Sequence, residues 1–398
     1  MGVLVACGGS GGEITETSPE PEQLEESEKR DTETEKAEET EKAEETDEEL
    51  LPIEQESSNK CGLSLSWDDP TCQVVTIKVG KDPVDVVSDG TYIWVLNRGG
   101  SPSSGCSTLS KINPASTQVV DTIKLGCNKG SRSMAFDGTY LWVVNGAGSI
   151  CGGGPQCPDR TVSKIDVVLN EEIATVKFGN PWNVFSFGKS IGTDIWVANA
   201  FMNNGGSIFR IDTDTNTIVD TIKVPQSEPV LAYDGRYLWV GDAAGISNSQ
   251  SISKIDLVKG EVNATIEIWG GSVALTFDGT NIWFASDKCE EYLPMFQGEV
   301  TSIDVARNTI ARDVPENGYA ASREVDDCLQ DIAYDGTFVW AISDFGVHKF
   351  NPNSASVQTL DNLYGVFDSP EAITFDGTHI WITDRTAGTV VKLPMRQP

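Results

Sequence analysis

The chain has 398 residues, with 60 acidic and 29 basic side chains and a formal net charge of −31. Such an acidic chain is a poor partner for nucleic acid, whose phosphates need Lys and Arg, and for anionic lipid headgroups. The sequence contains no apolar run long enough to cross a bilayer as a helix. Its length would suggest two or three domains, although one array of repeats can account for all of it.

The first seven residues end in Leu4-Val5-Ala6-Cys7 and precede a Gly-Gly-Ser-Gly-Gly run. This stretch resembles the lipobox of bacterial lipoproteins, which implies lipidation of Cys7 and attachment to a membrane. The residues before Cys7 are too few for a signal peptide, so this hypothesis requires a start further upstream. The alternative is a chance match at the start of a cytosolic protein.

Residues 8–60 form a low-complexity segment with 20 acidic and 5 basic side chains. Its apolar content is too small to offset the entropy lost on ordering, so we expect a disordered segment that its own charge keeps extended. A spacer that lifts a domain off a membrane and a generic solubilising tail both fit this composition.

From Thr71 onward the sequence consists of short runs rich in Val, Ile and Thr, which is typical of strands. One period contains four of them, at residues 131–136, 140–145, 161–167 and 171–177. An Asp-Gly pair joins the first two, and we expect a hairpin there because both residues tolerate positive φ. The period is marked by an Asp-Gly-Thr-aromatic-aliphatic-Trp phrase, degraded in its third copy. The seven copies contain Trp94, Trp142, Trp196, Trp239, Trp283, Trp340 and Trp381.

Four strands in each of seven periods predict an all-β fold, a seven-bladed β-propeller, over residues 61–398. We name the strands of a blade A to D from the axis outward. Residues 73–80 match the D strand at 118–126, whereas the last period stops after its C strand at 389–393. The N-terminal strand is therefore expected to complete blade seven and close the ring, which protects two strand edges.

The seven repeated tryptophans are interpreted as wedges that fill the space between blades, because each occupies the same place in strand B. Trp182 and Trp269 break this register and come just before an A strand. They are better candidates for contact with a ligand.

Nine cysteines suggest disulfides and an oxidising compartment. The B–C and D–A connections of a propeller lie on one face, so cysteines in those connections can meet. On this geometry we predict four pairs: Cys61–Cys72, Cys106–Cys127, Cys151–Cys157 and Cys289–Cys328. Metal binding is the rival explanation, but the spacing from Cys151 to Cys157 lacks the close pairs and nearby His of zinc sites.

The chain has two histidines, His348 in a C strand and His379 beside an Asp-Gly turn. Neither is placed at the mouth of the channel, so both are interpreted as structural and no Ser-His-Asp triad is expected. No glycine-rich phosphate loop followed by a helix is present.

The repeated Phe-Asp-Gly-Thr-x-Ile-Trp, Ser-Lys-Ile-Asp and Val-x-x-Thr-Ile-x-x-Gly phrases resemble bacterial seven-bladed propellers of the YVTN type. They are similar too to the streptogramin (virginiamycin B) lyase superfamily. That resemblance implies a metal-assisted elimination by His and Glu around the axis, but no histidine here matches the pattern. No catalytic residue is carried over.

The leading hypothesis is a non-enzymatic binding or scaffold protein of the bacterial cell envelope, lipid-anchored, periplasmic or extracellular, and monomeric. The alternatives are a metal-assisted lyase or hydrolase and a structural subunit of an envelope complex. A protein or glycan could meet the face with the B–C and D–A loops. The polar ring at the start of the A strands could take a cation, including a divalent one, or could be only a solvated rim. The candidate ligand-binding residues are Asp82, Arg132, Trp182, Asn183, Glu228, Trp269, Ser272, Gln330, Asp331 and Glu371.

Overall fold

The structure is a computed structural model. It describes the strands of the propeller and does not describe residues 1–73 or several connecting segments. The described residues are 74–100, 105–127, 129–146, 160–178, 184–191, 194–200, 205–243, 250–268, 270–287, 298–310, 323–325, 328–344, 346–354, 357–360 and 366–393. The expected lipobox at 1–7 and acidic segment at 8–60 lie outside them. None of the described ranges holds a helix that is long and apolar enough to span a bilayer.

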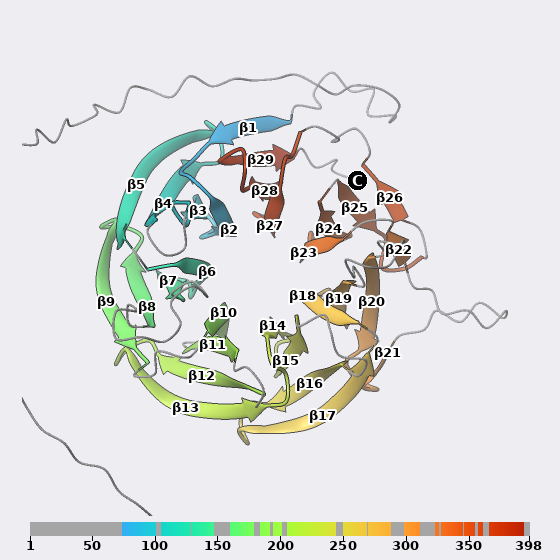
Figure 1. Cartoon of the computed structure of the whole chain (residues 1–398). Coiled ribbons are helices and arrows are strands. Elements are labelled where there is room, and N and C mark those ends of the chain that lie inside the picture. The colour runs from blue at the N-terminus through green and yellow to red at the C-terminus, as the bar shows by residue number, and fades with distance from the viewer. Residues whose placement is uncertain are drawn as a thin grey trace, which may run out of the picture. The chain divides into compact units, whose positions relative to one another are not determined.

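Within these residues, strands form seven antiparallel sheets arranged in a ring, so the predicted seven-bladed propeller is confirmed (Figure 1). The strands of blades one to four, from the axis outward, are β2 (Pro83–Ser88), β3 (Ile93–Asn97), β4 (Cys106–Asn113), β5 (Gln118–Cys127); β6 (Ser131–Phe136), β7 (Tyr140–Asn145), β8 (Thr161–Asp166), β9 (Glu171–Lys177); β10 (Val184–Ile191), β11 (Asp194–Ala200), β12 (Gly206–Asp212), β13 (Thr217–Val224); and β14 (Pro229–Tyr233), β15 (Tyr237–Asp242), β16 (Gln250–Asp256), β17 (Glu261–Ile268).

Blades five to seven continue the same order, with two departures at the outermost position. Their strands are β18 (Gly271–Phe277), β19 (Asn281–Asp287), β20 (Gly298–Asp304), β21 (Thr309–Ile310), β22 (Arg323–Val325); β23 (Leu329–Tyr334), β24 (Val339–Ser343), β25 (Val347–Phe350), β26 (Val357–Thr359); and β27 (Pro370–Phe375), β28 (Ile380–Asp384), β29 (Thr389–Leu393), β1 (Val75–Lys78). In blade five, β21 and β22 both pair with β20, so two short strands share the place of one D strand.

The ring closes as expected, through β1 on the outer edge of blade seven. β1 runs antiparallel to β29, with Val75 opposite Lys392 and Lys78 opposite Thr389. Ile77 is 3% exposed and shares a core cluster with Trp381 of blade seven and residues of blade one. Strands from the two ends of the propeller sequence are therefore held in one sheet.

The Asp-Gly turns owe their regularity to hydrogen bonds of the aspartate. Asp335 Oδ1 accepts from the backbone N–H of Thr337 and Phe338, at 2.7 and 2.6 Å, and its Oδ2 accepts from Trp340 Nε1 at 2.6 Å. The hairpin expected at the Asp-Gly pair is confirmed, and of the two residues Gly336 adopts positive φ, at 91°. The same three hydrogen bonds are made by the turns at Asp89, Asp137, Asp234, Asp278 and Asp376.

The repeated tryptophans fill the space between blades, as predicted. Trp340 is 1% exposed and packs with Ile373 and Ile380 of blade seven, and Trp94 packs in the same way on Leu141 of blade two. All seven are buried, so none of them offers its ring to a ligand.

The lysine of the Ser-Lys-Ile-Asp phrase joins neighbouring blades, a role that its sequence context did not reveal. Lys254 Nζ lies 4.9 Å from the ring centroid of Trp239 in its own blade. It donates to Val305 O and Asn308 Oδ1 of blade five, at 2.6 and 2.8 Å. Lys111, Lys164 and Lys392 likewise reach a carbonyl of the next blade. Each of these cations holds two neighbouring blades together, on the side of the ring that carries the turns between A and B strands.

Replacing Lys254 by Met should lower the free energy of unfolding by about 1–3 kcal/mol. The apolar length of the side chain is kept, but the two acceptors in blade five lose their donor. Urea unfolding followed by tryptophan fluorescence measures the change. Lys259→Met, at a side chain that is 60% exposed, is the control and should leave the stability unchanged. An equal effect of both substitutions would contradict the role assigned to Lys254.

Candidate binding site in the axial channel

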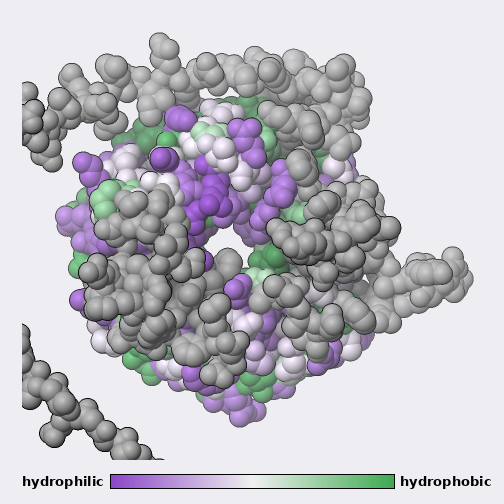
Figure 2. Space-filling view, in the orientation of Figure 1, coloured by the Kyte–Doolittle hydropathy of each residue, from purple (hydrophilic) through white to green (hydrophobic). Residues whose placement is uncertain are grey.

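A cavity of about 610 Å³ lies inside the ring, between the A strands of six blades. Figure 2 shows hydrophilic surface beside the central opening. Valine, leucine and alanine side chains form part of the wall, together with charged groups. The charged residues that line the cavity are Asp85, Arg98, Arg132, Glu228, Asp331 and Glu371.

β-Bulges in the A strands decide which side chains face this cavity. In β2 the pairing with β3 passes from Pro83 to Asp85, and in β6 the pairing with β7 passes from Ser131 to Ser133. The residue that is skipped has no partner on the B strand, and a bulge turns such a side chain out of the sheet. In five of the A strands the skipped residues line the cavity: Val84, Arg132, Val273, Gln330 and, in β27, Glu371 with Ala372.

Two aspartates at equivalent bulges connect the inner strands of adjacent blades. Asp85 Oδ2 accepts the backbone N–H of Met134 in blade two at 2.6 Å, and its Oδ1 accepts that of Val86 at 2.8 Å. Asp331 does the same for Ile373 of blade seven (2.9 Å) and Ile332 (2.8 Å). These carboxylates satisfy backbone N–H groups of the inner strands, which is a structural role for both.

Burial raises the pKa of Asp85 to about 7, and the charge of Asp331 adds to this effect. Hydrogen bonds from Met134, Val86 and Ser133 act in the opposite direction without cancelling it. Asp85 therefore exchanges its proton close to neutral pH at the wall of the channel.

The raised pKa of Asp85 predicts a pH-dependent stability. The folded chain binds this proton more tightly than the unfolded chain, whose aspartate has its ordinary value of 3.8. The stabilisation is therefore complete below about pH 4 and is lost as the pH rises through 7. This group should lower the free energy of unfolding by at most roughly 1.4 kcal/mol per pH unit across that window.

Urea unfolding of wild type and Asp85→Asn across this pH range tests the expectation. Wild type should lose stability relative to Asp85→Asn as the pH rises, because the amide does not titrate. Asp214→Asn, at an exposed turn residue, should run parallel to wild type. Parallel curves for Asp85→Asn and wild type would show that Asp85 has the same pKa in both states.

Asp82, predicted as a ligand-binding residue, is engaged in a network of arginines. It is buried, adopts a φ of 60°, and accepts from Arg98 Nε and Arg385 Nε, both at 2.8 Å. Arg385 also lies 3.6 Å from a carboxylate oxygen of Glu371. Burial raises the pKa of Glu371, while Arg385 and Arg98 oppose this shift. Asp82 thus holds two arginines in place and does not itself line the cavity.

Arg132 and Glu228 line the cavity from blades two and four. Among the described residues, neither side chain makes a hydrogen bond or an ion pair. Burial lowers the pKa of Arg132, the like charge of Arg98 adds to this, and Glu228 and Glu371 oppose it. The backbone of Glu228 is fixed by its N–H bond to Asp242 Oδ1 at 2.9 Å. One cation and one anion in the wall therefore remain available to a guest.

The other predicted site residues fall into two groups. Gln330 lines the cavity and donates to Asp344 Oδ1 at 2.8 Å, whereas Ser272 is buried, accepts the backbone N–H of Asp242 at 2.8 Å and does not line the cavity. Trp182, Asn183 and Trp269 lie outside the described residues. The structure adds three charged residues that the sequence did not single out: Asp85, Arg98 and Arg385.

The donor set does not fit the metal that the lyase resemblance implies. In the part of the chain that the structure describes, no three His, Cys, Asp or Glu side chains are grouped to hold a metal ion. His348 is buried, with Nε2 2.9 Å from Ser343 Oγ and Nδ1 3.2 Å from Thr359 Oγ1. His379 contacts Thr378 beside its Asp-Gly turn. A divalent cation in the channel stays a prediction.

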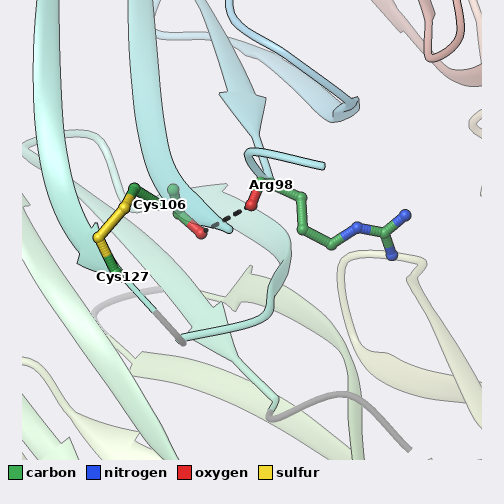
Figure 3. Close-up of a disulfide and its surroundings, with 4 residues drawn as sticks. Arg98, Cys106 and Cys127 are labelled. Carbon is green, nitrogen blue, oxygen red and sulfur yellow. Dashed lines mark hydrogen bonds between the residues drawn. A yellow bond between two sulfur atoms is a disulfide. The ribbon is translucent and has the colours of Figure 1, made fainter. Parts of the chain in front are cut away.

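The Cys106–Cys127 disulfide is confirmed and lies close to the site (Figure 3). It joins the start of β4 to the end of β5, where the two residues are directly opposite. The next residue, Ser107, donates from Oγ to Arg98 O at 3.5 Å, and the Arg98 side chain points away from the disulfide. Cys328 is also in a disulfide, with a partner outside the described residues. The other predicted pairs fall on cysteines beyond those residues: Cys61, Cys72, Cys151, Cys157 and Cys289.

Comparison with known proteins supports the fold alone. No family model matches the sequence, and no curated protein matches it significantly. Solved structures do match. Kuenenia stuttgartiensis hydrazine synthase has a TM-score of 0.59 and 17% identity over 80% of this chain and 97% of that chain. Virginiamycin B lyase from Staphylococcus aureus has a TM-score of 0.57 and 16% identity over 81% of this chain and 99% of that chain. The Swd1 β-propeller domain of Myceliophteria thermophila has a TM-score of 0.57 and 13% identity over 81% of this chain and 98% of that chain.

Proposed function

We propose that this propeller is a non-enzymatic binding protein whose small polar ligand occupies the axial cavity. The observation that supports it best is a cavity of about 610 Å³ whose wall offers Arg132 and Glu228 without partners among the described residues. Buried ionic groups are costly unless they are paired, so a wall of this kind favours a charged guest. Proteins with a similar fold have varied functions, and the similarity to a lyase carries no residue of its chemistry to this channel.

In this proposal the protein is displayed on a bacterial envelope. Lipidation of Cys7 would anchor it, and the acidic segment at 8–60 would act as the spacer. The Cys106–Cys127 disulfide supports an oxidising compartment outside the cytosol. Membrane fractionation of the protein from its native host, compared with its Cys7→Ser variant, tests the anchor. Equal membrane fractions for the two proteins would exclude lipidation at Cys7.

A cavity-filling variant tests the axial site. Val273 lines the cavity at a bulge, so Val273→Trp places an indole in it without removing a charged group. We expect small polar compounds that raise the melting temperature of wild type to lose that effect on Val273→Trp. Val258→Trp, at an outer turn residue that is 98% exposed, is the control and should respond like wild type. Equal responses of wild type and Val273→Trp would place binding outside the channel.

A further inference from the structure

The charged groups of the channel wall differ in whether they are already engaged. Asp82 is bound by Arg98 and Arg385, and Glu371 lies beside Arg385. Asp85 and Asp331 accept backbone N–H groups. Arg132 and Glu228 remain, on the wall of the same cavity, and neither has a partner among the described residues.

These two residues are electrostatically coupled but do not neutralise each other by contact. Glu228 raises the pKa of Arg132, although no ion pair within 4.0 Å joins the two side chains. They approach the axis from β6 and from the residue before β14, on either side of the inner strand of blade three. A guest can therefore contact both of them from within the channel.

The guest that satisfies both groups is a zwitterion. A guanidinium binds a carboxylate through two parallel N–H bonds, and a carboxylate accepts from an ammonium group. An anion alone would leave Glu228 unpaired, and a cation alone would leave Arg132 facing the like charge of Arg98. Leu231 of blade four and Val273 of blade five make part of the same wall apolar, which suits a short hydrocarbon chain in the guest.

We propose that the axial cavity binds a zwitterion with a carboxylate at Arg132, an ammonium group at Glu228 and an aliphatic linker between them. This inference rests on the proposed function and specifies its ligand class. Free amino acids with a separated amine and the side chains and termini of short peptides share this chemistry.

Calorimetry on the full chain with 6-aminohexanoate, 4-aminobutanoate and glycine as zwitterions, and with hexanoate and hexylammonium as single ions, tests it. One of the zwitterions should bind about tenfold or more tightly than either single ion, because two charge-assisted contacts form in place of one. Arg132→Gln and Glu228→Gln should each reduce its affinity to that of a single ion. The double variant should lose no more binding free energy than the sum of the losses in the two single variants. Lys259→Gln, which removes an exposed positive charge that does not line the cavity, should bind as wild type. Circular dichroism establishes that each variant is folded.

The contrary outcomes separate this inference from the proposed function. If hexanoate or hexylammonium binds as tightly as the zwitterions, the site takes a single ion and the inference is wrong. If no zwitterion binds but another compound stabilises wild type and not Val273→Trp, the axial site stands and the inference again fails. If no compound stabilises wild type more than Val273→Trp, the proposed function and this inference are both wrong.

Discussion

A chain that begins at Gly80, and so lacks β1, is expected to lose the closed propeller. β1 provides the outer strand of blade seven, and Ile77 is buried against Trp381 and Val390 at the junction with blade one. Burial of Ile77 contributes roughly 1.5–3 kcal/mol, and the partly buried Val75 and Val79 add to it, so the loss of this strand removes a substantial part of the about 5–15 kcal/mol that stabilises a typical domain. The free edge of β29 would also be open to pairing with other chains.

Size-exclusion chromatography and thermal melting followed by circular dichroism measure this effect. The chain that begins at Gly80 should aggregate, form dimers or melt without a cooperative transition. A chain that begins at Cys61 retains β1 and is the control. It should melt close to the full chain, because the acidic segment at 8–60 has little apolar surface to bury. If both truncated chains melt alike, β1 is dispensable and the closure does not stabilise the ring.

Substitution of Trp381 by Ala should lower the free energy of unfolding by about 3–5 kcal/mol. The side chain is fully buried where blades seven and one meet, so its removal leaves a cavity that the surrounding strands cannot fill. Urea unfolding measures the loss. Val258→Ala, at a side chain that is 98% exposed, should leave the stability within the error of the method.

Trp381→Phe separates the ring from its hydrogen bond. Phenylalanine keeps much of the apolar volume but cannot donate to Asp376 Oδ2, which accepts from Trp381 Nε1 at 2.7 Å. The expected loss is about 1–3 kcal/mol, the cost of an unmet buried acceptor. A loss as large as that of Trp381→Ala would mean that the hydrogen bond outweighs the packing of the ring.

The fold could be predicted because its signals are local and recur. Alternating strand residues, an Asp-Gly turn and a tryptophan at a constant place return seven times, and each copy confirms the others. The unmatched strand at 73–80 and the missing last strand identified the closure through β1. The split outer strand of blade five, β21 and β22, has no such repeating signal and was not anticipated.

The residues that line the channel were predicted only in part. A β-bulge changes which side chain faces the channel, and no residue type in the sequence signals it. Arg132, Gln330 and Glu371 are bulged residues and do line the cavity. Ser272 lies one place before the bulged Val273 and Asp82 lies two places before the bulged Val84, and both are occupied by contacts within the protein. Arg98 and Arg385 follow B strands, so only the folded ring brings them to the A strands of blades one and seven.

Sequence patterns were sufficient to predict the seven blades, their closure, the buried tryptophans and the Cys106–Cys127 pair. Those features depend on strand periodicity, turn chemistry and the order of connections, all of which are encoded in neighbouring residues. Which charges are neutralised and which remain available could be seen only in the folded ring. Whether an arginine is paired depends on residues from other blades, as with Arg385 on Asp82, more than 300 positions away in the chain. Among the described charged residues of the wall, Arg132 and Glu228 are the two whose side chains have no hydrogen-bond or ion-pair partner.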